Sequence, residues 1–125
     1  MIHLDANFLI AGVNRANAEA KAIEHWLLAG ESLACSTLSW SEFLNGPVTS
    51  AQIATARNFL TAGCVEFAEA DAERAASLFN HTGRMRRLKF DCLIAATALV
   101  AGAELATRNV EDFRIFLPHG LKLAT

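Results

Sequence analysis

One pair of neighbouring segments decides the fold of this chain: Asp91-Cys92-Leu93-Ile94-Ala95-Ala96-Thr97-Ala98-Leu99-Val100-Ala101 and Glu104-Leu105-Ala106-Thr107. The uncharged run from Cys92 to Ala103 is shorter than the roughly 20 residues that span a bilayer, so it predicts a helix buried inside a soluble domain. The second segment is short and apolar, as buried strands are. A buried helix followed directly by a buried strand favours a parallel sheet with helices packed on its faces.

Strand-like and helix-like segments alternate along the rest of the chain. Asn17, Ser50 and Asp71 are the expected N-caps of three helices, and Gly30 is expected to end the first of them. The expected strands are residues 1–4, 33–36, 64–67 and 104–107, with 114–117 or 121–124 as a further edge strand, and the expected helices are residues 16–29, 39–46, 50–63, 71–83 and 91–101. We therefore predict an α/β fold whose central parallel sheet of four to five strands is flanked by helices on both faces.

Length and composition indicate one compact domain over residues 1–125. Of the 125 residues, 53% are hydrophobic and 19% are charged, only two are Pro, and no tract has the composition of a disordered tail or linker. No basic segment precedes an apolar stretch at the amino terminus, so a secretion signal is not expected. The three Cys residues share no metal-binding spacing and indicate reduced core residues of a cytoplasmic protein: Cys35, Cys64 and Cys92.

Net charge does not by itself indicate a nucleic-acid-binding protein. The formal net charge is −2, whereas such proteins usually carry a basic surplus that displaces counterions from phosphates. Four of the eleven basic side chains nevertheless fall within six positions: Arg84, Arg86, Arg87 and Lys89. They form either a local basic surface that contacts RNA or an ordinary solvated loop or helix end.

Four acidic residues occur where a parallel sheet would bring them together. Asp5 follows the first expected strand, and Glu42 opens the helix after the second. Asp91 opens the buried helix, and Asp112 lies in the loop after the last strand. Ligands of open α/β sheets bind outside the carboxyl ends of the strands, so we expect these acids to converge there.

Each acid also has a purely structural interpretation. Asp5 could begin a turn with Asn7. Glu42 could complete a capping box whose N-cap is Ser39. Asp91 could complement the positive end of its helix dipole. Asp112 could simply be a solvated loop residue.

Taken together, the acids predict a divalent-cation site. Two carboxylates about 4 Å apart repel by roughly 4 kcal/mol at an effective dielectric constant of 20, so a cluster of them needs cations. Oxygen ligands suit Mg²⁺ or Mn²⁺, and phosphodiester hydrolysis by a metal-activated water is the matching chemistry. The chain has no Gly-x-Ser-x-Gly motif, phosphate-binding glycine loop or His-Glu-x-x-His helix, and His3 is expected to be a core residue with satisfied hydrogen bonds.

Three parts of the chain match the pattern of a known family: Ile2-His3-Leu4-Asp5-Ala6-Asn7, Ser39-Trp40-Ser41-Glu42-Phe43, and the pair Asp91–Ala98 and Leu105–Phe113. The order and spacing of the last pair are the most specific of these features. With these segments the whole chain resembles a PIN domain, and among PIN domains it resembles the VapC-like toxin ribonucleases of type II toxin-antitoxin systems.

This resemblance implies endonucleolytic RNA cleavage with one or two Mg²⁺ or Mn²⁺ ions. It also implies a homodimer and a cognate antitoxin protein that blocks the acidic pocket. By position, the main metal-binding acids of the family correspond to Asp5, Glu42 and Asp91. The polar side chains that support those acids correspond to Asn7 and Thr107.

The chain departs from the family pattern in two places. Family members often have an acid where this chain has Asn109, and here Asp112 lies nearby instead. Either residue could complete the site, and Asp112 is the one we expect to assist metal binding and catalysis because it supplies charge. The stretch Arg84–Lys89 replaces the more usual connection that contains Gly-Pro, so its contact with RNA rests on charge alone.

Two other functional classes compete with the ribonuclease interpretation. The first is a non-catalytic, PIN-like dimeric module that binds or regulates a partner, and retention of Asp5, Glu42 and Asp91 argues against it. The second is a phosphate-accepting signalling domain, which requires an acid pair near the first strand and a Lys at a strand end. Lys122 comes too late in the chain to serve as that Lys.

Overall fold

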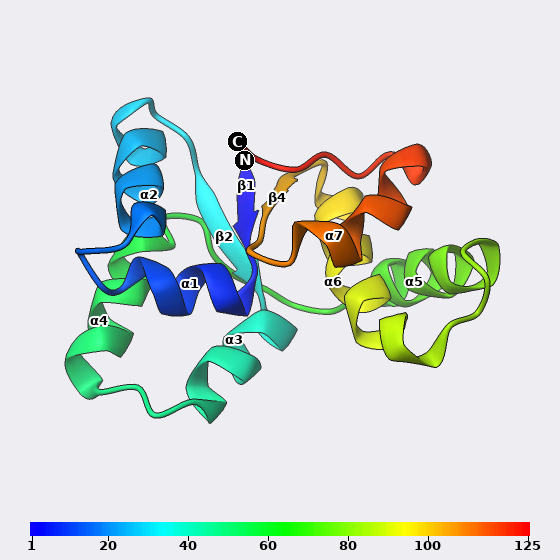
Figure 1. Ribbon diagram of the computed structural model, residues 1–125, viewed down its shortest axis with the longest axis horizontal. Helices are drawn as coiled ribbons and strands as arrows, with labels where there is room; N and C mark the ends of the chain where they lie inside the picture. The colour runs from blue at the N-terminus through cyan, green and yellow to red at the C-terminus, as the bar shows by residue number, and fades with distance from the viewer.

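Four short parallel strands form the sheet of this computed structural model, which describes all residues, 1–125 (Figure 1). The strands are β1 (Ile2–Leu4), β2 (Leu33–Ser36), β3 (Gly63–Val65) and β4 (Glu104–Ala106), in the spatial order β3-β2-β1-β4. In the register of the central strand β1, Ile2 pairs with Leu33 on one side and with Glu104 on the other. An isolated parallel bridge joins Leu105 to Leu123. The predicted α/β fold with a parallel sheet of four to five strands is confirmed.

Helices cover both faces of the sheet (Figure 1). The first group comprises α1 (Ala6–Gly12), α2 (Ala18–Leu28), α3 (Thr37–Asn45) and α4 (Ser50–Phe59). The second group comprises α5 (Glu69–His81), α6 (Lys89–Ala101), α7 (Val110–Phe113) and the 3-10 helices η1 (Arg86–Leu88) and η2 (Arg114–His119). None of these helices has the length and apolar composition needed to cross a membrane.

The core consists of two apolar clusters on opposite faces of the sheet. Ile2 and Leu4 of β1 belong to the first cluster, together with Phe43 of α3. Leu105 of β4 belongs to the second, together with Phe113 of α7. Successive strand residues point to opposite faces, so one sheet supplies both clusters. Each fully buried Leu or Phe side chain stabilises the fold by roughly 1.5–3 kcal/mol.

Two predicted N-caps are displaced by one to three residues. The N-cap of α4 is Thr49 rather than Ser50, because Thr49 and Gln52 form a reciprocal capping box. Asp71 lies inside α5, where its Oδ2 accepts the N–H of Ala68 at 2.7 Å. Thr49 and Ser50 can both serve as caps of α4, whereas α5 begins after Ala68, and Asp71 reaches back from inside the helix to the Ala68 N–H.

Two short helices are absent from the sequence prediction. Helix α1 has seven residues and α7 has four, which is too short for a helical period to stand out. Asp112 therefore lies in a helix rather than in the loop predicted for it. Residues 114–117 are part of η2 and not an edge strand, whereas the alternative segment 121–124 supplies the bridge at Leu123.

Two predictions about polar core residues are wrong. His3 is buried as expected, but its Nε2 has no hydrogen-bond partner, and burial lowers its pKa to about 4. Cys64 is exposed rather than buried. Its sulfur lies 3.8 Å from that of Cys35 on the neighbouring strand, because the two residues pair in the register of β2 and β3.

Candidate active site

Asp5 lies at the junction of β1 and α1, where the chain leaves the centre of the sheet. Its backbone N–H donates to the carbonyl of Ala106 at 2.9 Å, so β1 stays paired with β4 up to this point. Its extended backbone makes it the N-cap of α1, and its Oδ1 accepts the N–H of Ala6 at 2.9 Å. The residue that follows the strand therefore also begins the helix, which keeps its carboxylate at the carboxyl end of the sheet.

Hydrogen bonds hold this junction to the segment that follows β4. Thr107 Oγ1 donates to Asp5 Oδ2 at 2.8 Å and accepts the N–H of Asn109 at 3.0 Å. Asn7 Oδ1 accepts the N–H of Arg108 at 3.1 Å. We call these three bonds the Thr107 clamp. Because Asp5 Oδ1 is engaged by the helix and Oδ2 by the clamp, its carboxylate is fixed in orientation by the protein alone.

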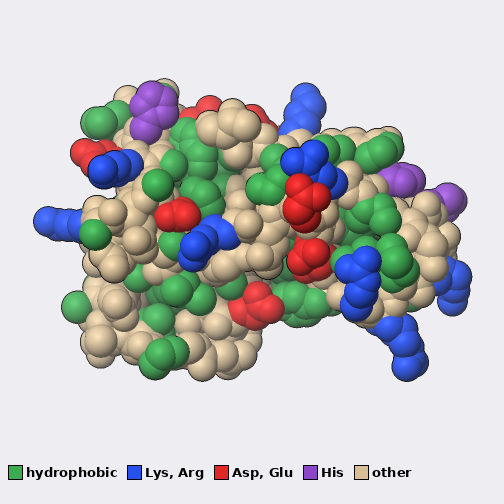
Figure 2. All heavy atoms as spheres, viewed as in Figure 1, with side chains coloured by type: hydrophobic (Ala, Val, Ile, Leu, Met, Phe, Trp, Pro, Cys, Tyr) green, Lys and Arg blue, Asp and Glu red, His purple; other side chains and the backbone are tan.

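Asp5, Glu42 and Asp91 line one cavity of about 370 Å³. They reach it from three segments, because Asp5 caps α1, Glu42 lies on α3 and Asp91 lies in the first turn of α6. Figure 2 shows acidic side chains along the middle of this face, with hydrophobic side chains beside them and Lys and Arg on either side. The other lining residues are Ala6, Asn7, Ile10, Asn45, Phe90, Ile94 and Asn109.

The carboxylates in this cavity disfavour one another's ionisation. Burial raises the pKa of Asp5, and the bonds from Thr107 and Ala6 oppose that rise. Burial and then the charge of Asp5 raise the pKa of Glu42. The pKa of Asp91 rises to about 6, first through burial and then through the charges of Asp112, Asp5 and Glu42. Mutual repulsion of this kind is what a bound cation relieves.

The capping-box interpretation of Glu42 is wrong. The N-cap of α3 is Ser36, whose Oγ accepts the N–H of Ser39 at 3.0 Å. Ser39 is therefore already inside the helix, and Glu42 lies too far along α3 to reach the first free N–H groups. The Glu42 side chain makes no hydrogen bond or ion pair with the rest of the chain, so it is available to a ligand.

Asn109 and Asp112 are the two candidates for a fourth metal-binding residue beside Asp5, Glu42 and Asp91. Asn109 lines the cavity, whereas Asp112 does not. The charge of Asp112 still acts on the acids, since it is the largest charge contribution to the raised pKa of Asp91. Asp112 is not a partner of Arg108, which instead pairs with Glu19 of α2 at an Nε–Oε1 distance of 3.3 Å.

The donor atoms of the cavity fit a hard divalent cation. No three His, Cys, Asp or Glu side chains are arranged as the complete ligand set of a metal ion. The polar side chains that line the cavity offer only carboxylate and amide groups, with no thiol and no imidazole. Oxygen donors of this type suit Mg²⁺ or Mn²⁺, and a bound cation would offset the burial and the mutual repulsion that raise the pKa values of Glu42 and Asp91.

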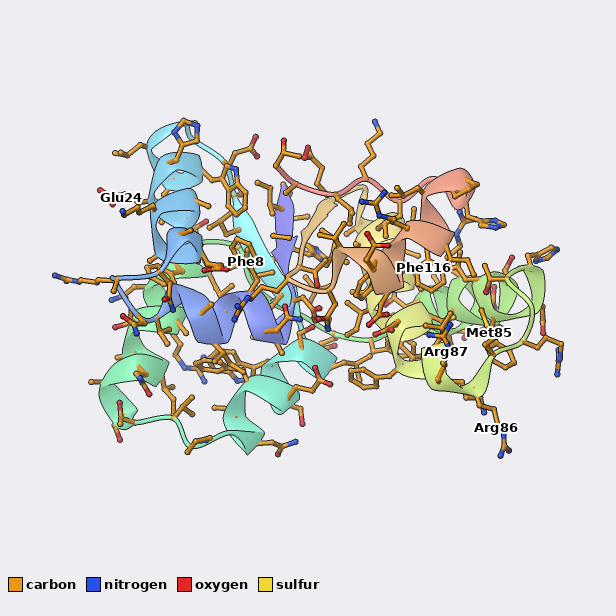
Figure 3. All side chains as sticks on the ribbon, viewed as in Figure 1. Phe8, Glu24, Met85, Arg86, Arg87 and Phe116 are labelled. Atoms are coloured by element: carbon orange, nitrogen blue, oxygen red, sulfur yellow. The ribbon has the colours of Figure 1, made fainter.

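The four basic side chains of the segment Arg84–Lys89 differ in whether they act on the acidic cavity. The Arg84 guanidinium and the Lys89 ammonium both lie over the ring of Phe79, at 5.3 and 5.7 Å from its centroid. Arg87 lies close enough to the cavity for its charge to lower the pKa of Asp91, opposing the burial and the acids. Arg86 points away from the body of the protein (Figure 3). One basic side chain of the four therefore acts on the acidic cavity.

A larger cavity, of about 570 Å³, lies between α1, α2 and α4. It contains one acid, Glu24, together with the basic residues Arg15 and Lys21. Figure 3 shows Glu24 on the outer side of α2, away from the ends of the strands. No cluster of acids forms there, so the smaller cavity is the candidate for metal chemistry.

Three residues of the acidic cavity have no role in the sequence prediction: Ile10, Asn45 and Phe90. Phe90 directly precedes Asp91, and Asn45 lies about one helical turn after Glu42 on α3. For Asn45 this spacing is a signal that the sequence contains, because side chains one turn apart share a helix face.

Comparisons with known proteins agree with this geometry. The family model of the PIN domain matches residues 2–115. A toxin-antitoxin complex from Klebsiella pneumoniae contains a chain 28% identical to this one, with 91% of each chain covered and a TM-score of 0.70. VapBC2 from Rickettsia felis, bound to a DNA fragment from its promoter, is 21% identical, covers 99% and 98% of the two chains and has a TM-score of 0.73. DNA-bound VapBC from Salmonella typhimurium is 19% identical, covers 98% and 96%, and has a TM-score of 0.73. No curated protein matches the chain.

Proposed function

This chain belongs to the PIN domain family, and from that premise we propose that it is a divalent-metal-dependent endoribonuclease, the toxin component of a type II toxin-antitoxin module. One observation carries the proposal. Asp5, Glu42 and Asp91 come from three separate segments, yet they share one cavity in which each has a raised pKa. Glu42 and Asp91 make no hydrogen bond or ion pair that would hold the fold together, whereas carboxylates at the end of a parallel sheet suit phosphodiester hydrolysis.

The acids take different parts in the proposed reaction. Asp5, Glu42 and Asp91 would hold Mg²⁺ or Mn²⁺, and Asp112 would assist them from α7 through its charge. When bound, the cation supplies a nucleophilic water and neutralises charge that grows on the phosphate oxygens. The Thr107 clamp keeps Asp5 in one orientation, and Asn109 offers an amide oxygen at the cavity wall.

The RNA backbone would approach the cavity from the side of Arg87. The Arg87 guanidinium is exposed, and its charge lowers the pKa of Asp91. A phosphate bound between Arg87 and the acidic cavity would therefore gain a cationic contact. Arg84, Arg86 and Lys89 would contribute only a diffuse positive field, since two of them lie over Phe79 and one points outward.

The proposed partners follow from the same family membership. A solved structure 28% identical to this chain is a toxin-antitoxin complex, which supports a cognate antitoxin protein as the partner here. We propose that the antitoxin covers the acidic cavity, that the toxin is a homodimer, and that it acts in the cytoplasm. The carboxylates of the cavity would attract a basic antitoxin side chain, which would take the place of the cation.

The experiment that tests the proposal is incubation of the purified protein with total cellular RNA in Mg²⁺, in Mn²⁺ and in excess chelator. We expect cleavage with either cation and none with chelator, and activity should return when the cation is restored. DNA of matching length serves as the control substrate. Cleavage that persists in chelator would contradict the metal mechanism. Intact RNA under every condition would instead favour the non-catalytic PIN-like binding module.

A further inference from the structure

The mouth of the acidic cavity carries an exposed aromatic ring. Phe90 is 37% exposed and lines the cavity next to Asp91, yet it belongs to neither apolar core cluster. Ile10 of α1 lines the same cavity and is 45% exposed. The exposed part of the Phe90 side chain gains nothing from burial within the chain, so it is available to a ligand of the cavity.

A free amide lies on another wall of the same cavity. Asn45 is the last residue of α3, and its side chain makes no hydrogen bond with any other group of the chain. An Asn side chain offers two donor hydrogens and one acceptor oxygen, which match the polar edges of nucleobases. The cavity therefore combines a flat apolar face, an unused amide and a cluster of acids suited to a phosphate-bound cation.

We propose that Phe90 and Asn45 form a nucleobase-binding subsite, in which an unpaired RNA base next to the scissile phosphate stacks on Phe90 and hydrogen-bonds to the Asn45 amide. The inference rests on the proposed ribonuclease function and deepens it by assigning two residues of this chain to the base next to the cleaved phosphate. Bases of a duplex are already stacked, and their edges are paired, so only an unpaired base can present both its face and its edge here.

The two residues have separate tasks in this subsite. Stacking on Phe90 tolerates any base because every base has a flat face, so it contributes affinity. The amide of Asn45 distinguishes bases by their donors and acceptors, so it contributes selectivity. Phe90 and Asp91 are neighbours on α6, so a base held by Phe90 has its own phosphate close to the acids.

The test measures binding rather than cleavage, in the Asp91→Asn protein, which is expected to be inactive. Fluorescently labelled RNA pentamers carry 2-aminopurine at one position each, and a matched set carries an abasic nucleotide at that position. We expect one 2-aminopurine position to be quenched by the protein. Phe90→Ala should abolish that quenching and weaken binding of the same pentamer roughly tenfold or more. The abasic pentamer should bind both proteins equally, because it has no base to stack.

Two further variants keep the test independent of folding. Phe90→Tyr retains a flat ring and should restore both affinity and quenching. Val100→Ala removes another exposed apolar side chain from the far end of the same helix and should change neither. Asn45→Ala should leave the quenching intact and reduce the difference in affinity among pentamers that carry different bases at the stacked position.

The outcomes separate this inference from the proposed function. Equal loss of affinity for base-bearing and abasic pentamers in Phe90→Ala, or no loss for either, overturns the subsite. In that case the parent protein still binds RNA, and the ribonuclease proposal stands. If the Asp91→Asn parent binds no pentamer at all while remaining folded, the RNA substrate itself is wrong, and both proposals fall together.

Discussion

The two walls of the acidic cavity hold their carboxylates in opposite ways. On one wall, Asp5 is buried, and each of its carboxylate oxygens accepts a hydrogen bond from the chain. On the other wall, Asp91 and Glu42 have no such partners, and the charge of Asp112 further raises the pKa of Asp91. The first wall therefore keeps its geometry without a ligand, whereas the second needs a cation to balance its charge.

This difference suggests a division of labour within the site. A fixed carboxylate provides a reference position for a cation, and unpartnered carboxylates provide most of the affinity when the cation enters. Substitutions on the hydrogen-bonded wall should consequently change stability and orientation, whereas substitutions on the unpartnered wall should change charge with little cost to folding.

The largest effect should come from removing charge at the three shared acids. Asp5→Asn, Glu42→Gln and Asp91→Asn should each lower the RNA cleavage rate by roughly 100-fold or more, because the cation loses a charged oxygen ligand. Single-turnover cleavage in saturating Mg²⁺ measures this, and Glu24→Gln on α2, outside the cavity, is the matched control. Wild-type rates in any two of the three variants would remove the shared metal site.

The next largest effect should come from the Thr107 clamp. Thr107→Val keeps the shape of the side chain but leaves Asp5 Oδ2 and the Asn109 N–H without their partner. We expect the free energy of unfolding to fall by about 1–3 kcal/mol and cleavage to fall roughly 10- to 100-fold. Chemical denaturation and cleavage rates measure the two effects, and Thr107→Ser should retain most of both. A Val variant that is fully stable and active would show that the clamp does not orient Asp5.

A smaller effect should separate the two candidates for the fourth position. Asp112→Asn should weaken Mg²⁺ binding and cleavage roughly tenfold and leave the fold intact, because the residue acts through its charge from the surface of α7. Asn109→Asp should keep or tighten metal binding, since it adds a carboxylate at the cavity wall. Isothermal titration with Mg²⁺ measures both. Unchanged affinity in Asp112→Asn, together with a loss in Asn109→Ala, would assign the fourth position to Asn109.

The stability of the metal-free protein should depend on pH through Asp91. Its folded pKa of about 6 lies above its ordinary value of 3.8, so between these values the folded chain holds a proton that the unfolded chain has lost. The free energy of unfolding therefore falls as pH rises from about 4 to about 6 and stays low above that. Asp91 is only half-buried, so solvent screens part of its repulsion. We therefore expect Asp91→Asn to raise the free energy of unfolding by about 1 kcal/mol at pH 7 in chelator.

Denaturation of both proteins at pH 4 and pH 7 in chelator measures this gain. The two proteins should be nearly equal in stability at pH 4, where the wild-type carboxyl is already protonated in the folded chain. Added Mg²⁺ should stabilise the wild type more than Asp91→Asn. Equal metal-dependent shifts would mean that Asp91 does not contact the ion.

The smallest effect should distinguish Arg87, beside the acidic cavity, from Lys89, beside Phe79. Arg87→Gln should weaken RNA binding a few-fold and make binding less dependent on salt, because it removes the basic side chain next to the acidic cavity. Lys89→Gln, whose ammonium lies over Phe79, should change RNA binding less. Anisotropy titrations at two salt concentrations compare the variants. A larger loss in Lys89→Gln would assign the RNA contact to the side of Phe79.

Most of the chain's framework is predictable from the sequence because it depends on local patterns. The apolar run from Cys92 and the strand-like segments around it predict the parallel sheet, and all four strands lie within a few residues of their expected positions. Helices α1 and α7 are not predictable in this way, since each is too short to repeat a hydrophobic period. The start of α4 is displaced by one residue because two cap-forming residues adjoin there, Thr49 and Ser50.

The sequence by itself determined which chemical groups the site could contain. Asp5 adjoins the carboxyl end of β1, Asp91 lies in the first turn of α6, and Glu42 lies on the helix that follows β2, so their convergence followed from the general architecture of parallel sheets. The tertiary structure alone decided how each group is held. Bonds such as that from Thr107 to Asp5 join residues about one hundred positions apart, and whether Phe90 is exposed depends on which elements pack against its helix. The spacing of hydrophobic residues along the chain indicates whether a segment is a helix or a strand. Contacts between elements depend instead on the order β3-β2-β1-β4 in which the strands assemble.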